Sequence, residues 1–206
     1  MVPIIEPGGR AIAHVHLPDG MIPLRWCALC YALAGSVVAL GIYKMPRERL
    51  VPAGLLAGLS FALMQVPILH AHINLTGLIG ILMGPLASAP IVFLVNLACG
   101  LLGHGGITLV GLNTLLNWSE CAGAWALYRA LRGAIGARLA AGIATFTVLS
   151  TTALVAALIV ARVVGRSPYY FLITLTPSWI LTAAIEAPIT ASAVAALERM
   201  TPEWVR

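Results

Sequence analysis

The chain has very few charged residues for its length. Asp, Glu, Lys and Arg make up 9% of its 206 residues, whereas 60% are hydrophobic and the mean hydropathy is +0.97. A protein with so little polar surface is unable to cover a water-exposed domain of this size. Because a helix satisfies its own backbone hydrogen bonds in lipid, we predict an all-α integral membrane protein that crosses the cell membrane several times.

Lysine and motifs for catalysis are also nearly missing. Lys44 is the only lysine, and no Gly-x-x-x-x-Gly-Lys sequence leads up to it, so there is no phosphate loop for hydrolysing ATP. The sequence has no His-Glu-x-x-His motif, which disfavours a membrane zinc protease. The other basic residues are single arginines that form no basic stripe, so we predict no nucleic-acid partner. We therefore expect a protein that is not an enzyme and that takes any transport energy from partners or an ion gradient.

Cysteine is scarce, and every cysteine lies in an apolar segment. The four are Cys27, Cys30, Cys99 and Cys121. Cys27 and Cys30 have CxxC spacing, but a zinc knuckle needs a second such pair, which the sequence lacks. We expect neither a structural disulfide nor a zinc knuckle, and we interpret these residues as small apolar packing groups.

Apolar runs fill most of the chain and predict about seven transmembrane helices. The expected ranges are 24–43, 50–69, 75–83, 85–102, 109–131, 138–164 and 170–197. The third is too short to cross roughly 30 Å of hydrocarbon alone, so we expect a half-helix or a segment buried against its neighbours. The dipeptide Gly84-Pro85 predicts a sharp break after it.

Basic residues near the predicted helix ends indicate the orientation. Three follow the first helix, three lie around the connection between the fifth and sixth, and two are near the carboxyl terminus: Lys44, Arg47 and Arg49; Arg129, Arg132 and Arg138; Arg199 and Arg206. Because cytoplasmic loops carry an excess of Lys and Arg, we predict the amino terminus outside and the carboxyl terminus inside. Arg162 and Arg166 oppose this trend.

All five histidines lie in three short stretches outside the predicted helices. They are His14 and His16, His70 and His72, and His104. The predicted topology brings the three stretches to the same external side. Neutral imidazole suits zinc, copper, nickel and cobalt, whereas the scarcity of carboxylates disfavours magnesium and calcium. We predict a site for a divalent transition metal; the alternative is that each histidine lies singly at the bilayer interface.

The first residues suggest a second way to supply metal ligands. Residues 1–13 form a short extension ahead of a single domain over 14–206, and Val15 is what a GTG start codon would be read as within a longer frame. Initiation at Val15 would give Met-His-Leu-Pro-Asp-Gly, with a terminal amine beside His16. Amine, deprotonated amide and ring nitrogen fill three corners of a plane around nickel(II), and one more imidazole fills the fourth.

Two predicted helices carry polar residues at helical spacing. Asn113, Asn117 and Glu120 share one face of the fifth predicted helix, and Thr182, Glu186 and Thr190 share one face of the seventh. An intramembrane carboxylate is a candidate for a proton relay or for a hydrogen-bonding partner of a ligating histidine. The other interpretation, which we favour, is a stripe of interhelical hydrogen bonds that fixes the packing.

Three motifs together resemble the CbiM/NikM family. They are His16-Leu17-Pro18-Asp19-Gly20, then His72-Ile73-Asn74-Leu75-Thr76-Gly77-Leu78 running into Gly84-Pro85, then His104-Gly105-Gly106 with Gly111 and Asn113 downstream. Family members are the substrate-binding membrane components of energy-coupling-factor importers for cobalt and nickel. The resemblance is specific over roughly residues 13–131, and beyond that only hydropathy and helix length agree.

The resemblance implies a ligand set. Family members begin with Met-His, whose amine, amide and imidazole bind the metal, and a histidine before the third helix completes the plane. By position, His16 matches the first ligand and His72 the second. The chain departs from the pattern because residues precede His14, so either translation starts at Val15 or the side chains of His14 and His16 bind instead. His104, Asn74, Asn113 and His70 are then supporting residues.

The resemblance also implies partners. Ni2+ or Co2+ would be the transported substrate, with ATPase subunits, a transmembrane coupling subunit, a small accessory membrane subunit and membrane lipid as partners, in a context of cobalamin biosynthesis. Two alternatives stay open. One is a stand-alone metal or proton permease that uses Glu120 and Glu186 as a relay, and the other is a membrane metal sensor.

Overall fold

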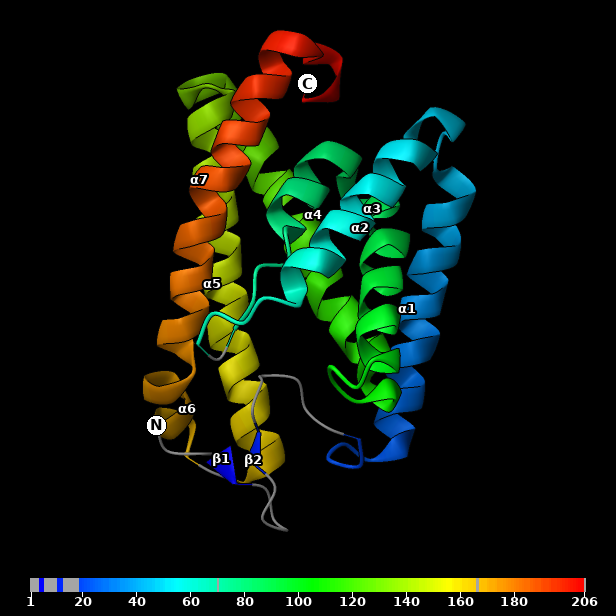
Figure 1. Ribbon diagram of the computed structural model, residues 1–206, viewed down its shortest axis with the longest axis vertical. Helices are drawn as coiled ribbons and strands as arrows, with labels where there is room; N and C mark the ends of the chain where they lie inside the picture. Colours follow the sequence, from blue (N-terminus) through cyan, green and yellow to red (C-terminus); the bar gives the residue numbers. More distant parts are fainter. Residues whose placement is uncertain (1–3, 6–10, 13–18, 70, 166, 206) are drawn as a thin grey trace.

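The computed structural model describes residues 4–5, 11–12, 19–69, 71–165 and 167–205, and most of them form a helical bundle (Figure 1). The helices are α1 (Leu24–Lys44), α2 (Leu50–Met64), α3 (Thr76–Leu101), α4 (Val110–Ile135), α5 (Ala137–Val164), α6 (Pro168–Thr174) and α7 (Thr176–Met200). Short 3-10 turns occur at η1 (Arg47–Arg49), η2 (Ile107–Leu109) and η3 (Pro202–Trp204). Two strands of two residues each, β1 (Ile4–Ile5) and β2 (Ala11–Ile12), pair antiparallel near the amino terminus.

Four helices, α1, α3, α5 and α7, are long and apolar enough to cross a membrane. Large apolar side chains on the outer faces of α1, α2 and α5 are exposed, among them Leu33, Leu55 and Leu158. Such a surface suits lipid rather than water. The protein is a multi-pass membrane protein, as the composition predicted.

Helix α3 is interrupted at the predicted break. Gly84 has φ 76° and ψ 173°, which divides α3 into an arm of residues 76–83 and an arm of residues 85–101. The positive φ favours glycine, and Pro85 lacks the N–H that would continue the helix. The third and fourth predicted helices are therefore the two arms of one broken element.

The two arms of α3 lead to opposite ends of the bundle (Figure 1). Near the end of the first arm, the Leu82 carbonyl accepts a hydrogen bond from Arg49, which belongs to the α1–α2 connection. Near the end of the second arm, Gly100 packs against Ile107 and Val110. The first arm begins at mid-bundle, because Thr76 contacts Glu120 in the middle of α4.

Two other predicted helices differ from the structure at their ends. The second was expected to reach residue 69, but α2 ends at Met64, because Pro67 disfavours helical backbone in the residue before it. The last was expected as one helix over 170–197. It is instead the short α6 followed by α7, with Leu175 between them and Pro177 in the first turn of α7.

Close helix packing depends on glycine at two contacts with α4. A Cβ on Gly80 of α3 would lie 2.1 Å from the carbonyl oxygen of Cys121, and a Cβ on Gly111 would lie 2.6 Å from the backbone nitrogen of Tyr31 in α1. Small residues of this kind allow helix backbones to approach in a membrane. All four cysteines are free thiols.

Candidate metal-binding pocket

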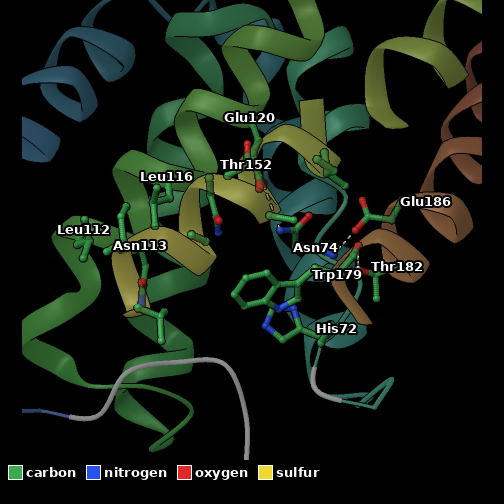
Figure 2. A pocket seen from close by; sticks show the side chains of 17 residues that line it. His72, Asn74, Leu112, Asn113, Leu116, Glu120, Thr152, Trp179, Thr182 and Glu186 are labelled. Atoms are coloured by element: carbon green, nitrogen blue, oxygen red, sulfur yellow. Dashed lines mark hydrogen bonds between the residues drawn. The ribbon is translucent and has the colours of Figure 1, made fainter. Parts of the chain in front are cut away.

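A cavity of about 160 Å³ lies between the segment after α2 and helices α4, α5 and α7 (Figure 2). Its polar lining residues are His72, Asn74, Asn113, Asn117, Glu120, Thr152, Thr182 and Glu186. Its walls are apolar, with leucines and alanines from α4 and α5 and the indole of Trp179 from α7. A mostly apolar cavity with a few converging polar groups is the usual form of a small-ligand site.

Two of the three histidine stretches meet beside this cavity. The ring centroids of His72 and His104 are 5.5 Å apart, with their planes at 72°. His72 comes from the segment between α2 and α3, and His104 from the connection between α3 and α4. Gly103 and Gly105 on either side of His104 have φ of 76° and 107°, so the turn that presents this histidine requires glycine.

Asp19 brings the end of the amino-terminal stretch to the same region. Its carboxylate accepts hydrogen bonds from the backbone N–H of Ile107 at 3.1 Å, from the backbone N–H of Thr108 at 2.8 Å, and from the Thr108 hydroxyl. These bonds, led by the hydroxyl of Thr108, hold the pKa of Asp19 below its ordinary value. Gly106 permits the approach, because a Cβ there would lie 2.7 Å from the backbone nitrogen of Asp19.

Two predicted ligands and one predicted supporting residue of these stretches are outside the part of the chain that the structure describes. This applies to His14, His16 and His70. Among the described residues, no group of three or more His, Cys, Asp or Glu side chains is arranged to hold a metal ion. The described region therefore shows the neighbouring imidazoles of His72 and His104 and no further imidazole beside them.

Two buried glutamates hold the segment that carries His72. Glu186, 1% exposed, accepts a hydrogen bond from the backbone N–H of Asn74 at 2.9 Å. Glu120 accepts one from the Thr76 hydroxyl at 2.7 Å and a longer one from the Asn74 amide at 3.4 Å. Figure 2 shows Asn74 between the two carboxylates. The hydroxyl of Ser60 donates to the Asn74 carbonyl at 2.6 Å, which ties the same segment to α2.

This bonding supports a strained backbone at the start of α3. Leu75 has φ 57° and ψ 22°, a left-handed conformation that is uncommon for a leucine, and its side chain is buried. Such a residue costs roughly 1–2 kcal/mol and persists only when its surroundings fix it. The hydrogen bonds to Asn74 and Thr76 on either side of Leu75 supply that constraint.

The polar faces predicted on two helices converge on the pocket. Asn113, Asn117 and Glu120 from α4 and Thr182 and Glu186 from α7 all line it. The α4 face makes interhelical hydrogen bonds to α3, because Glu120 accepts one from Thr76 and Asn117 donates one to Asn96 at 3.5 Å. Glu186 of α7 instead binds the backbone of Asn74, in the segment between α2 and α3. Thr190 is buried on the same helix as Glu186 but is not part of the lining.

Some residues of the pocket were not predicted. Thr152 of α5 and Trp179 of α7 line it, and nothing in their local sequence distinguishes them from ordinary helix residues. Thr76 was part of a recognised motif but had no assigned role. Thr76 lies two residues after Asn74, at the first residue of α3, and its backbone N–H donates to the Asn74 side-chain oxygen at 3.2 Å. An asparagine two residues before a helix start is the signal that indicates such a local bond.

The fold and the pocket together define a class: a multi-pass helical membrane protein with a polar cavity edged by histidines. Comparison with known proteins makes this specific. The chain belongs to the CbiM family, described as the cobalt uptake substrate-specific transmembrane region, whose model matches residues 16–204.

Relatives are named for cobalt and nickel. The chain is 30% identical over 213 residues to the cobalt transport protein CbiM of Geobacter sulfurreducens, covering 92% of this chain and 61% of that protein. It is 33% identical over 106 residues to a putative fused nickel transport protein NikMN of Archaeoglobus fulgidus, covering 48% of this chain and 36% of that protein. The chain thus spans less than two thirds of these relatives' lengths.

Two solved structures share the fold. A truncated transition metal transporter superposes with a TM-score of 0.78 at 19% identity, covering 90% of this chain and 99% of that one. A second transition metal transporter also has a TM-score of 0.78, at 21% identity, covering 90% of this chain and 93% of the other.

Proposed function

We propose that this protein captures Co2+ or Ni2+ from outside the cell, as the substrate-binding component of an energy-coupling-factor importer. The observation that carries the proposal is the meeting of His72 and His104 beside a polar cavity, with Asp19 held at the same place by Thr108. The amino terminus is then outside and the carboxyl terminus inside. The clustering of Lys44, Arg49 and Arg129 around one cavity at the other end supports this orientation.

The ligand set combines His72 with the amino-terminal stretch. If translation starts at Val15, His16 and the terminal amine supply the remaining nitrogen donors. If it does not, the side chains of His14 and His16 supply them. Asp19 follows His16 by three residues, and its bonds to Thr108 fix the chain close to the loop of His104. Nitrogen ligands in a plane favour nickel, and cobalt is accepted if the plane distorts.

Glu186 and Glu120 act on the metal indirectly, as positioning residues. Their hydrogen bonds fix Asn74 and Thr76, which follow His72 by two and four residues. Groups of this kind orient a metal ligand and commonly change affinity by about 10–100-fold when removed. Asn113 and Asn117 line the cavity, His104 lies beside His72, and all three would support the bound ion or its water.

Release of the metal into the cell requires partners. The chain has no phosphate loop, so ATPase subunits and a transmembrane coupling subunit, with a small accessory subunit, would reorient it. The metal would then serve cobalamin biosynthesis or nickel enzymes.

A stand-alone permease is the second candidate, and one observation favours it. Glu120 and Glu186 line the same cavity as His72, so a carboxylate path continues from the histidines toward mid-bundle. Uptake of 63Ni or 57Co into vesicles that contain only this chain separates the two candidates. Accumulation without ATPase subunits supports the permease, and accumulation only with them supports the importer component.

Metal binding to purified protein tests capture itself. Protein starting at Met1 and protein starting with Met in place of Val15 are incubated with Ni2+ or Co2+, desalted and analysed by inductively coupled plasma mass spectrometry. We expect near-stoichiometric metal, with tighter binding in the shorter form. His72→Ala should lose most of it, whereas Tyr43→Ala, an exposed aromatic outside both cavities, should not. Stoichiometric metal on His72→Ala would remove His72 from the ligand set.

A further inference from the structure

A second cavity, of about 380 Å³, lies at the other end of the bundle from His72. It is formed where α1 ends, where α3 breaks at Gly84, along the later part of α4, and against η3 at the carboxyl terminus. Its charged and aromatic lining residues are Lys44, Arg49, Arg129, Trp125, Trp204 and Glu203. Metal capture makes no use of this cavity.

The lining of the cavity has a net positive charge, and aromatic rings stack against two of its arginines. The guanidinium carbon of Arg49 lies 4.8 Å from the ring centroid of Trp204, and that of Arg129 lies 5.4 Å from the ring centroid of Trp125. Stacking of this kind holds the plane of a guanidinium in a fixed direction. Glu203 is the single carboxylate against three cations in the lining, so an anion is favoured there.

The rest of the lining is apolar. A site for a small solvated anion does not need an apolar wall, so the wall indicates a ligand with an apolar part. Ile81, Leu82 and Met83 come from the end of the first α3 arm, and Leu86 from the start of the second. The cations and the two indoles therefore lie next to an apolar wall, in which Ile81, Leu82 and Met83 are buried and Leu86 is partly exposed. Tryptophan and arginine together at the ends of transmembrane helices are typical of the headgroup level of a bilayer.

We infer that this cavity binds the phosphate-bearing headgroup of an anionic phospholipid. The phosphate would lie among Lys44, Arg49 and Arg129, with acyl chains along the apolar wall. Basic pockets between helices at a membrane surface recognise such headgroups, and each basic residue strengthens binding roughly fivefold. The inference is independent of metal capture, because it rests on the opposite end of the molecule.

Native mass spectrometry of the purified full chain tests the inference. The protein in detergent is titrated with phosphatidylglycerol, with phosphatidylcholine and with inorganic phosphate. We expect one tightly held phosphatidylglycerol, weaker phosphatidylcholine, and no displacement of the lipid by millimolar phosphate. The double variant Lys44→Gln/Arg129→Gln should bind phosphatidylglycerol roughly 30-fold more weakly. Both side chains are exposed, so the fold should persist, and thermal unfolding checks this.

The matched control removes two arginines from the opposite end. Arg25 and Arg162 are also exposed, and Arg25→Gln/Arg162→Gln loses the same charge without touching the cavity. It should keep wild-type lipid binding. Equal loss in both double variants, or equal binding of the two lipids, would overturn the site. Displacement by inorganic phosphate would show a free-anion site instead. A third outcome is possible if a coupling subunit binds the chain. Loss of the subunit's binding in Lys44→Gln/Arg129→Gln, with lipid binding unchanged in that variant, would show that the cavity is a protein-docking surface.

Discussion

The two cavities lie at opposite ends of one short helical arm. The polar pocket contains buried carboxylates, whereas the charged residues that line the basic cavity are mainly cations. Residues 76–83 of α3 begin at the polar pocket, where Thr76 contacts Glu120, and end at the basic cavity, where Arg49 binds the Leu82 carbonyl. Eight residues of helix span about 12 Å. In the polar pocket, buried carboxylates accept hydrogen bonds from a backbone N–H and a hydroxyl. In the basic cavity, cations stack on indole rings near the surface.

The difference reflects the cost of removing charge from water. A carboxylate at mid-bundle is tolerated only if nearby donors bind it, and Asn74 and Thr76 supply them. Arginines at the bundle end can reach the interface, and Arg49 is oriented there by the Trp204 ring and by its hydrogen bond to the Leu82 carbonyl. The first arrangement fixes the segment that carries His72, and the second orients the guanidinium groups of Arg49 and Arg129 on indole rings.

The largest effect is expected from a substitution that disturbs both cavities at once. Gly80→Ala, in the shared arm, would drive a Cβ into the Cys121 backbone, and we expect a loss of about 3 kcal/mol in the free energy of unfolding. Metal and lipid binding should both weaken. Gly54→Ala is the control, because a Cβ there meets open space. Denaturant unfolding in detergent measures both, and equal stability of the two variants would contradict the packing described for α3 and α4.

Acidification should weaken metal binding but not lipid binding. Metal binding should weaken about fivefold per imidazole ligand between pH 6.5 and 5.5, because protons compete for ligating histidines. Lipid binding should hardly change, since Lys and Arg stay charged. The pKa of Asp19 is lowered from 3.8, so its stabilising bonds are fully present above that value and are lost only as pH falls through the lower pKa of the folded state. A flat profile of metal retention over this range would count against imidazole ligation.

Loss of the Asp19 carboxylate should have a smaller effect, confined to the histidine end. Asp19→Ala removes the hydrogen bonds to Ile107 and Thr108, and we expect metal affinity to fall about fivefold, in the range of a lost capping residue at an exposed site. Lipid binding should be unchanged. Isothermal titration with Ni2+ compares Asp19→Ala with Glu48→Ala, an exposed acidic residue outside the polar pocket. Equal affinities would mean that Asp19 does not position the amino-terminal stretch.

Salt should have the smallest effect and should act on the basic end alone. Raising NaCl from 0.1 to 0.5 M should weaken phosphatidylglycerol binding by about two- to threefold, because screening acts on charges near the surface. Coordination of the metal by neutral nitrogen donors should change less. Parallel titrations in the two salt concentrations measure both, and the reverse ranking would mean that the two regions have been assigned the wrong chemistry.

Local patterns predicted much of the fold. Hydropathy indicated a multi-pass helical protein, Gly84-Pro85 indicated the break in α3, and four helices satisfy the length and composition of membrane spans. The end of α2 at Met64 and the division between α6 and α7 were missed. Hydropathy continues through both places, and the prolines there act on backbone geometry rather than on polarity.

The candidate site was predictable in its residue types but not in its contacts. The spacing of Asn113, Asn117 and Glu120 placed them on one face, and all three line the pocket. Nothing in that spacing showed that Glu120 binds Thr76. The roles of His14 and His16 as ligands and of His70 as a supporting residue remain predictions, because those residues lie outside the described part of the chain.

The sequence by itself determined that this protein lives in a membrane, where α3 breaks, and which histidines are available, because hydropathy and the conformational limits of glycine and proline act within a few residues. Only the tertiary structure decided that Glu186 binds Asn74, 112 positions earlier, and that Arg49 stacks on Trp204. Such pairs depend on how whole helices pack, and packing joins residues whose local sequence carries no record of each other.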